Sequence, residues 1–285
     1  MGPTGQSPLN RTGFPSRLPP ETAARGEEAE APMAAAAVAQ EQTNPTASRP
    51  VRCIVKLGGA AITNKGELES IDVESLRSAC AQLRQAMSHN AGAAEKVVGM
   101  DWSRRPGDPT DPVVDAEGLS EMESLGIDTN FVVVHGAGSF GHFQASRSGV
   151  HKGGLHSTLV KAGFVATRIS VTSLNQEIVR ALAREGIPSV GMSPFACGWS
   201  TKQRKLASVD ASQIIQSLHV GFVPISVASH DTTGGMETKI LEAAAIARLG
   251  VDVYITKVGT EHSLRALKGD TSSEDWLGTV IRSSK

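Results

Sequence analysis

The sequence predicts an α/β fold with a mostly parallel central sheet. Short β-rich runs alternate with segments whose apolar residues recur at helical spacing, the order expected when helices connect parallel strands. Three strand or loop ends carry glycine pairs or triplets, which suits ligand binding at the carboxyl edge of an open α/β sheet. A chain of 285 residues is long enough for one large domain of this class.

Composition argues against several classes of function. The formal net charge of -1 gives no bias toward nucleic acid or membrane surfaces, and aromatic residues at 4% are too few for a base-stacking platform. No apolar run approaches the ~20 residues needed to span a bilayer. The cysteines Cys53, Cys80 and Cys197 are widely separated and lack metal-ligand spacing. They are typical of reduced thiols, so we expect a cytoplasmic protein that binds neither nucleic acid nor membrane.

The first 50 residues differ in composition from the rest. Residues 1–50 hold eight of the 14 prolines and almost no large apolar side chains. Such a segment buries too little surface to offset the entropy of ordering it, so we expect a disordered extension. The folded domain is expected over residues 51–285. Met33, which precedes a run of alanines, is an alternative to Met1 as the start of translation.

The domain is expected to begin with a strand and a helix. Cys53 to Leu57 is a β-rich run that stops at Gly58-Gly59. Asp72 to Met87 has apolar residues at helical spacing, and Asp72 is a suitable N-cap. Residues 88–129 carry little pattern, which predicts an insertion loop.

A second series of elements begins at Phe131. The stretch FVVVHGAGSFGH predicts a strand that ends in a second glycine turn. The elements expected after it are a helix over residues 159–185, strands at Ser189–Met192 and Gly221–Ile225, a helix from the Gly234-Gly235 pair to Gly250, and a strand at Val251–Lys257.

The spacing Gly136-x-Gly138-x-x-Gly141 suits two kinds of anion. In a dinucleotide-binding fold, an acidic residue about 20 positions downstream would hold the ribose hydroxyls. Residues 137–176 contain no Asp or Glu, and carry His, Lys and Arg instead. This locally cationic stretch argues against the dinucleotide interpretation and favours a phosphate ligand held by backbone N–H groups.

Other catalytic signatures are missing from the sequence. It contains no G-x-x-x-x-G-K-[ST] loop, no protein-kinase motif set, no G-x-S-x-G nucleophile elbow and no His/Cys metal cluster. The chemistry that remains is phosphoryl transfer assisted by backbone N–H groups and lysine charges.

Three motifs together resemble those of a known family. VKLGGAAIT, HGAGSFGH and TTGGMETK, in this order, resemble the amino acid kinase superfamily and, within it, the isopentenyl phosphate kinases. The resemblance covers residues 52–257 and beyond, apart from the 88–129 insertion. Its most specific element is His142, directly after the Gly-Ser-Phe-Gly turn. It implies a three-layer αβα sandwich and ATP-dependent phosphorylation of isopentenyl phosphate to isopentenyl diphosphate, in isoprenoid biosynthesis.

The resemblance also implies roles for individual residues. Lys56, Lys65 and His142 are the implied catalytic residues, with Lys65 stabilising charge on the transferring group. Ala137, Gly138 and His142 would hold the phosphate of isopentenyl phosphate. The residues implied at the ATP phosphates are Lys56, Gly58, Gly59, Ala60, Gly138, Gly234, Gly235 and Lys239, with Mg²⁺ bridging the phosphates. Apolar residues of the 159–185 helix, including Phe164, Ile169 and Leu174, would line a pocket for the prenyl tail.

These roles agree with the chemistry of the reaction. An acceptor phosphate oxygen is already anionic and needs no general base. Catalysis then reduces to positioning and neutralisation of charge, for which Lys, His and N–H groups are suited.

The chain departs from the family pattern after the run Gly221–Pro224. Family members normally continue into a His-Gly-Asp turn that helps bind the acceptor phosphate, then add a helix and a strand that ends in a nucleotide-binding loop. Here only Ile225 to His230 separate that run from the stretch Asp231-Thr232-Thr233-Gly234-Gly235. We therefore expect a family segment to be missing near residues 224–225, which leaves the sandwich incomplete.

Three functions stay open at this point. The first is an isopentenyl phosphate kinase that acts as a homodimer. The second is a non-catalytic truncated isoform that binds phosphate ligands or pairs with intact subunits. The third is a related small-molecule kinase with another acceptor.

Overall fold

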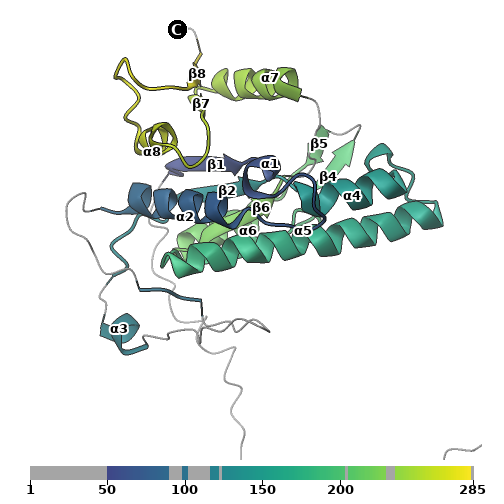
Figure 1. Cartoon of the computed structure of the whole chain (residues 1–285), viewed down its shortest axis with the longest axis horizontal. Coiled ribbons are helices and arrows are strands. Elements are labelled where there is room, and N and C mark those ends of the chain that lie inside the picture. Colours follow the sequence, from purple (N-terminus) through teal and green to yellow (C-terminus); the bar gives the residue numbers. More distant parts are fainter. Residues whose placement is uncertain are drawn as a thin grey trace, which may run out of the picture. The chain divides into compact units, whose positions relative to one another are not determined.

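A four-stranded parallel sheet, in the order β1-β2-β6-β3, forms the centre of the fold (Figure 1). The computed structural model describes residues 50–89, 98–101, 116–121, 124–202, 205–228 and 235–283. The sheet strands are Cys53–Leu57 (β1), Phe131–His135 (β2), Ser189–Met192 (β3) and Val223–Val227 (β6). This architecture confirms the predicted α/β class with a parallel central sheet. The predicted disordered extension lies outside the described residues, apart from Pro50.

The carboxyl ends of the four strands meet at one edge of the sheet. Leu57 of β1 lies opposite His135 of β2, and His135 lies opposite Val227 of β6. In β3, Met192 lies opposite Ser226. Because all four strands run in the same direction, the loops that follow them gather at this edge.

Helices α2 (Val73–Met87) and α5 (Thr158–Arg184) pack on the same face of the sheet. The strand residues beneath them recur at every second position, as the pleat requires. The buried core that they share comprises Leu57, Ile62, Leu76, Ala79, Cys80, Leu83, Met87, Phe131, Val133, Phe140, Leu174, Ile178, Leu182, Ile187, Val223 and Ile225. Helix α6 (Ser212–His219) contacts β6 and contributes no side chain to this core.

Helix α2 begins where the sequence predicts. The Asp72 carboxylate accepts a hydrogen bond from the Ser75 backbone N–H at 3.0 Å and from the Ser75 hydroxyl at 2.8 Å. These bonds stabilise the charged carboxylate, so they lower the pKa of Asp72. The N-cap satisfies one of the backbone donors that a helix start leaves unpaired.

Shorter elements surround the sheet. They are α1 (Gly59–Ile62), α3 (Ala116–Glu121), α4 (Ser139–Ser148), a 3₁₀ turn η1 (Val150–Lys152), β4 (Ser200–Lys202) and β5 (Lys205–Ser208). Helix α4 packs along α5, and β4 and β5 form an antiparallel hairpin. Helix α3 falls inside the 88–129 segment, where an isolated bridge also joins Ser88 to Ile127. The described parts of this segment therefore hold some regular structure.

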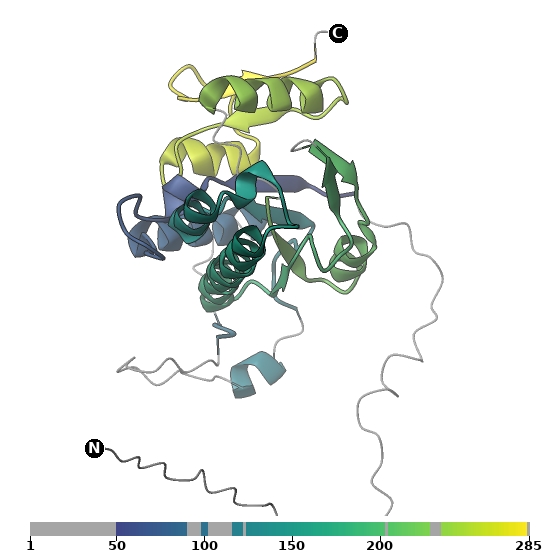
Figure 2. The same ribbon diagram turned by 90° about the vertical axis from the view of Figure 1, so that its right-hand side faces the viewer.

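The carboxyl-terminal elements form their own small layer of structure (Figures 1 and 2). They are α7 (Gly235–Ala247), β7 (Val253–Ile255), α8 (Glu261–Lys268) and β8 (Thr279–Ile281). Strand β7 pairs antiparallel with β8 in a separate two-stranded sheet. The strand predicted at Val251–Lys257 therefore exists in shortened form, and it does not belong to the parallel sheet.

Helix α8 attaches these elements to the core by contacting α2. Gln82 of α2 donates through Nε2 to the Thr260 carbonyl oxygen at 2.9 Å. Its Oε1 accepts a hydrogen bond from the Ser263 hydroxyl at 2.8 Å. One glutamine thus holds both the cap and the first turn of α8.

Candidate functional site

Two glycine turns meet backbone to backbone at the carboxyl edge of the sheet. Gly58-Gly59 follows β1, and Gly136 to Gly138 follows β2. A Cβ on Gly59 would lie only 2.6 Å from the Cα of Gly138, and a Cβ on Gly136 only 2.7 Å from the Gly59 nitrogen. Side-chain carbons do not approach other atoms this closely, so glycine at these positions is what allows the two turns to touch.

Thr63 joins the two turns. Its hydroxyl donates to the Gly59 carbonyl oxygen at 2.8 Å and accepts a hydrogen bond from the Ser139 N–H at 3.1 Å. The Ser139 hydroxyl donates to the Ser70 carbonyl oxygen at 3.1 Å. Both side chains are buried, so these bonds fix the start of α4 against the loop that follows α1.

The second turn presents backbone donors that no group of the described residues occupies. The Gly136 N–H donates to the Leu57 carbonyl oxygen at 2.9 Å. Within the described ranges, the N–H groups of Ala137 and Gly138 donate to no acceptor. The His142 side chain is exposed in the first turns of α4, which begins directly after Gly138. The turn thus offers the N–H groups of Ala137 and Gly138, and His142 follows in the first turn of α4, which together give hydrogen-bonding capacity for an anion.

The two predicted catalytic lysines are both exposed. Lys56 lies in β1, opposite Val134 and one residue before the end of the strand. Lys65 lies in the loop after α1, whose ends are joined by the bond from the Asn64 N–H to the Ser70 carbonyl oxygen at 3.0 Å. Neither lysine forms an ion pair with a described residue. Their charges are therefore available to a ligand.

The residues predicted to bind the nucleotide lie in two separate parts of the structure. Gly58, Gly59 and Ala60 belong to the paired turns. Gly235 is the first residue of α7 and Lys239 is exposed on that helix, which packs against β7 and β8. Gly234 lies outside the described residues.

A buried polar pair beneath the second turn was missed by the sequence analysis. His135 is completely buried at the end of β2, and Asn175 of α5 is 5% exposed. The Asn175 Nδ2 lies 3.0 Å from His135 Nε2 and 3.0 Å from the Ile225 carbonyl oxygen. Burial lowers the pKa of His135, which favours the neutral ring. The polarity of Asn175 on a mostly apolar helix face is the only sequence signal for this pair, and Ser170 on the same helix is buried and polar as well.

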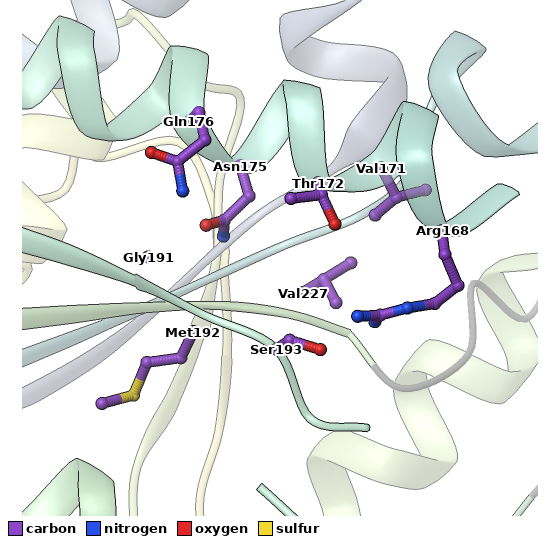
Figure 3. A pocket seen from close by; sticks show the side chains of 9 residues that line it. All are labelled: Arg168, Val171, Thr172, Asn175, Gln176, Gly191, Met192, Ser193 and Val227. Carbon is purple, nitrogen blue, oxygen red and sulfur yellow. The ribbon is translucent and has the colours of Figure 1, made fainter. Parts of the chain in front are cut away.

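A shallow pocket lies between α5 and the ends of β3 and β6 (Figure 3). Its volume is about 70 Å³, and it is partly open to solvent. In Figure 3 the Arg168 side chain reaches from α5 toward Ser193 and Val227, whereas Met192 points away from the helix. The Arg168 guanidinium also lies 5.4 Å from the ring centre of Phe195. The residues that line the pocket are Arg168, Val171, Thr172, Asn175, Gln176, Gly191, Met192, Ser193 and Val227.

The three apolar residues predicted to line a prenyl pocket do not share one environment. Leu174 is fully buried in the core, and Ile169 is 65% exposed. Phe164 stacks edge-on against Phe195 at 5.4 Å. Their spacing of five residues turns each one about 140° from the next on a helix of 3.6 residues per turn. The described pocket uses other positions of α5, at spacings of three and four residues.

The fold and its paired glycine turns define an α/β protein of the amino acid kinase class. The model of the amino acid kinase family matches residues 116–228. Among solved structures, one of isopentenyl phosphate kinase superposes with a TM-score of 0.57 at 22% identity, covering 80% of this chain and 99% of that one. A product complex of the isopentenyl phosphate kinase from T. acidophilum superposes with a TM-score of 0.53 at 19% identity, covering 81% and 99%.

Sequence comparison narrows the class to one family. The isopentenyl phosphate kinase of Arabidopsis thaliana is 48% identical over 326 positions, covering 84% of this chain and 97% of that protein. The isopentenyl phosphate kinase of Methanothermobacter thermautotrophicus is 32% identical over 124 positions, covering 41% and 46%. The chain belongs to the isopentenyl phosphate kinase family.

The alignment with the Arabidopsis protein is longer than this chain. It runs over 326 positions, whereas 84% of 285 residues is about 239. About 87 aligned positions, the difference between these two numbers, therefore hold a residue of the Arabidopsis protein and none of this chain. Because the alignment covers 97% of the Arabidopsis protein, it reaches close to both ends of that protein, and the positions without a counterpart here lie between them.

Proposed function

We propose that this chain transfers the γ-phosphoryl group of ATP to isopentenyl phosphate, giving isopentenyl diphosphate and ADP. The observation that carries the proposal is the pair of glycine turns packed against each other beside His142. Family membership supplies the two substrates. An acceptor phosphate oxygen forms a bond to the γ-phosphorus while the bond from that phosphorus to the β–γ bridging oxygen breaks.

The acceptor turn needs donors and positive charge but no base. A phosphate monoester loses its second proton at about pH 6, so its oxygens are already nucleophilic at neutral pH. We assign the N–H groups of Ala137 and Gly138, with the His142 side chain, to the acceptor phosphate. Lys56 and Lys65 neutralise charge that builds up on the transferring group.

The nucleotide side is assigned to the remaining turn and to α7. Gly58, Gly59 and Ala60 are proposed to approach the ATP phosphates through their backbone, and Gly234, Gly235 and Lys239 to complete that site. Mg²⁺ characteristically binds substrate phosphates together with one or two carboxylates. The described residues hold no cluster of three or more metal-binding side chains. We therefore propose that the ATP phosphates and water bind Mg²⁺, without a ligand from the described residues.

We also propose that a family segment is missing from the chain, near residues 224–225 or shortly after them. Strand β6 runs unbroken through Pro224 and Ile225, both of which are buried. The match to the family model ends at residue 228, one residue after this strand. These two facts favour a position just after β6 for the roughly 87 residues that the Arabidopsis protein has in addition.

A homodimer and a cytoplasmic location remain predictions. Among the helices of the described residues, none is long and apolar enough to cross a bilayer. The cysteines Cys53, Cys80 and Cys197 are unpaired thiols.

The first experiment measures turnover by the purified full chain. Isopentenyl phosphate, ATP and Mg²⁺ are supplied, and isopentenyl diphosphate is followed by ³¹P NMR while ADP is followed by a coupled assay. We expect both products in equal amounts. His142→Ala removes one donor to the transferring phosphates and is expected to lower turnover by about a hundredfold.

The matched control replaces another exposed histidine. His219 ends α6, outside the paired turns, so His219→Ala is expected to keep the wild-type rate. A folded, monodisperse wild-type sample that forms no ADP would overturn the proposed function. Equal rates for the two histidine variants would remove His142 from the site.

A further inference from the structure

We propose that Asn175 is a positioning residue for the acceptor turn, acting through the tautomer of His135. The proposal rests on the proposed function for the identity of the ligand. Asn175 makes no hydrogen bond to the described residues of the turn, but its carboxamide determines which nitrogen of His135 carries the proton. That proton in turn fixes the orientation of the peptide between Gly136 and Ala137.

The orientation of the Asn175 amide follows from its partners. The Ile225 carbonyl oxygen, 3.0 Å from Asn175 Nδ2, can only accept a hydrogen bond. The atom facing it is therefore the NH₂ group. The Asn175 Oδ1 lies beside Gly191 of β3, where a Cβ would overlap that oxygen. Glycine in β3 thus leaves room for the amide in this orientation.

The same NH₂ group selects the tautomer of His135. It lies 3.0 Å from His135 Nε2, which must accept the hydrogen bond and therefore carries no proton. The proton of the neutral ring then sits on Nδ1. Nδ1 lies 3.1 Å from the Gly136 carbonyl oxygen and donates to it. Burial lowers the pKa of His135, so the neutral ring persists near pH 7.

The direction of the Gly136 carbonyl fixes the direction of the next N–H. In a planar trans peptide the carbonyl oxygen and the following amide hydrogen point in opposite directions. Because the Gly136 oxygen is held by the buried ring, the Ala137 N–H points away from that ring. No described residue accepts from the Ala137 N–H, which leaves it available to a ligand.

The hydrogen bond from His135 matters because Gly136 by itself would not keep the 136–137 peptide in one orientation. Gly136 has no Cβ to restrict its dihedral angles, so rotation of the 136–137 peptide is sterically cheap. A rotated peptide would turn a carbonyl oxygen toward the acceptor phosphate, where two negative partial charges would repel. Asn175 and His135 exclude that orientation, and α5 thereby organises the acceptor turn through the buried His135 ring.

The first test removes the amide. Asn175→Leu keeps a similar volume but can neither donate to His135 nor orient it. We expect its KM for isopentenyl phosphate to rise about tenfold or more while its KM for ATP changes little. Ser173→Ala, an exposed position on the same helix, serves as the control and is expected to match wild type.

The second test separates the two ring nitrogens. An Asn side chain places its NH₂ close to the position of His Nδ1, whereas a Gln side chain places its amide close to the position of Nε2. His135→Asn retains a donor for the Gly136 carbonyl oxygen, and His135→Gln does not. We expect His135→Asn to keep more of the affinity for isopentenyl phosphate than His135→Gln. Thermal unfolding of both variants checks that they are equally folded.

A third measurement does not depend on turnover. The ¹⁵N shifts of the His135 ring report its tautomer, and the amide signal of Ala137 reports the turn in the presence of isopentenyl phosphate. We expect an Nδ1–H ring and an Ala137 signal that responds to the ligand in wild type, with both changed in Asn175→Leu. An Nε2–H ring in wild type, or an Ala137 signal unaffected by Asn175→Leu, overturns the proposal.

The NMR result also separates this inference from the proposed function. The positioning role of Asn175 is supported if wild type has an Nδ1–H ring and if Asn175→Leu loses this tautomer and reorients the Ala137 amide. This result would support it even in a chain that forms no product. Product formation that is unchanged in Asn175→Leu would agree with the proposed function and would contradict the positioning role of Asn175.

Discussion

Gly59 and Gly138 bring two backbone segments closer than any side chain would allow. The turns touch because neither residue carries a Cβ, and Gly138 also has a positive φ of 50°. The geometry of the site therefore depends on the lack of a Cβ at Gly59 and Gly138 as much as on the side chains around it. This makes glycine substitution a direct probe of the paired turns.

Gly59→Ala is expected to destabilise the fold and to lose activity. Its new Cβ would overlap the backbone of Gly138, and overpacking of this kind costs about 1–3 kcal/mol. Gly66→Ala is the matched control, because nothing lies within 4 Å of the position of its Cβ and its φ is not positive. Urea unfolding should show a loss for Gly59→Ala and a change within about 0.5 kcal/mol for Gly66→Ala. Equal unfolding free energies for the two variants would contradict the close approach of the turns.

The two histidines at the ends of HGAGSFGH show what a sequence can reveal about a site. His142 is exposed, and both the cationic stretch after the glycine turn and the family resemblance drew attention to it. His135, seven residues earlier, is fully buried and held by Asn175, which lies 40 residues further along the chain. No local pattern distinguishes these two environments, because the burial of His135 depends on how α5 crosses the sheet. The glycine turns could be predicted, but the support beneath them could not.

At the scale of elements, local signals predicted the strands and helices of the core well. Strand β1 and helix α2 begin and end where the sequence placed them, because a glycine pair stops one and an Asp72 cap starts the other. Helix α4 was missed, since its ten residues SFGHFQASRS lack an apolar stripe. The pairing of β7 was also missed, because its partner β8 lies beyond α8 and no local feature identifies it.

The cap of α8 should control how firmly the carboxyl-terminal elements are held. Thr260 and Ser263 form a capping box, in which the Thr260 hydroxyl accepts from the Ser263 N–H at 3.4 Å and the Ser263 hydroxyl accepts from the Thr260 N–H at 3.1 Å. The Thr260 hydroxyl also donates to the Lys257 carbonyl oxygen at 2.8 Å. Thr260→Ala removes both bonds of this hydroxyl at a cost of about 1 kcal/mol. We expect faster hydrogen exchange over residues 253–283 and unchanged exchange in β1.

Ser272→Ala provides the comparison for that variant. Ser272 is exposed in the loop between α8 and β8, so its loss should leave exchange in α8 at the wild-type level. Uniformly faster exchange in β1 and α8 of Thr260→Ala would show that the cap supports the whole fold. That outcome would contradict a local role for the cap.

At the scale of the whole molecule, the parallel sheet ends at β1. In the described residues no strand pairs with the outer edge of β1, and Ile54 in this strand is 66% exposed. Strand β7 pairs with β8 instead of extending the sheet. The unpaired N–H and C=O groups of an exposed edge strand can pair with another chain and so invite association. The roughly 87 positions present only in the Arabidopsis protein are the natural source of additional structure.

A chimera can test how much that absence costs. The chimera would carry, after residue 228, where the match to the family model ends, the segment of the Arabidopsis protein that we propose is missing from this chain. We expect the chimera to bind ATP more tightly and to turn over at least about tenfold faster, because the nucleotide side is the one that the missing residues would complete. Affinity for isopentenyl phosphate should gain less than affinity for ATP, since the acceptor turn, His142 and the Asn175–His135 pair are already in place and the inserted segment adds only the His-Gly-Asp turn on that side. Calorimetric titration of each substrate separates the two effects. A chimera whose gain is in isopentenyl phosphate affinity, with ATP binding unchanged, would show that the missing residues serve the acceptor and would contradict this division of the site.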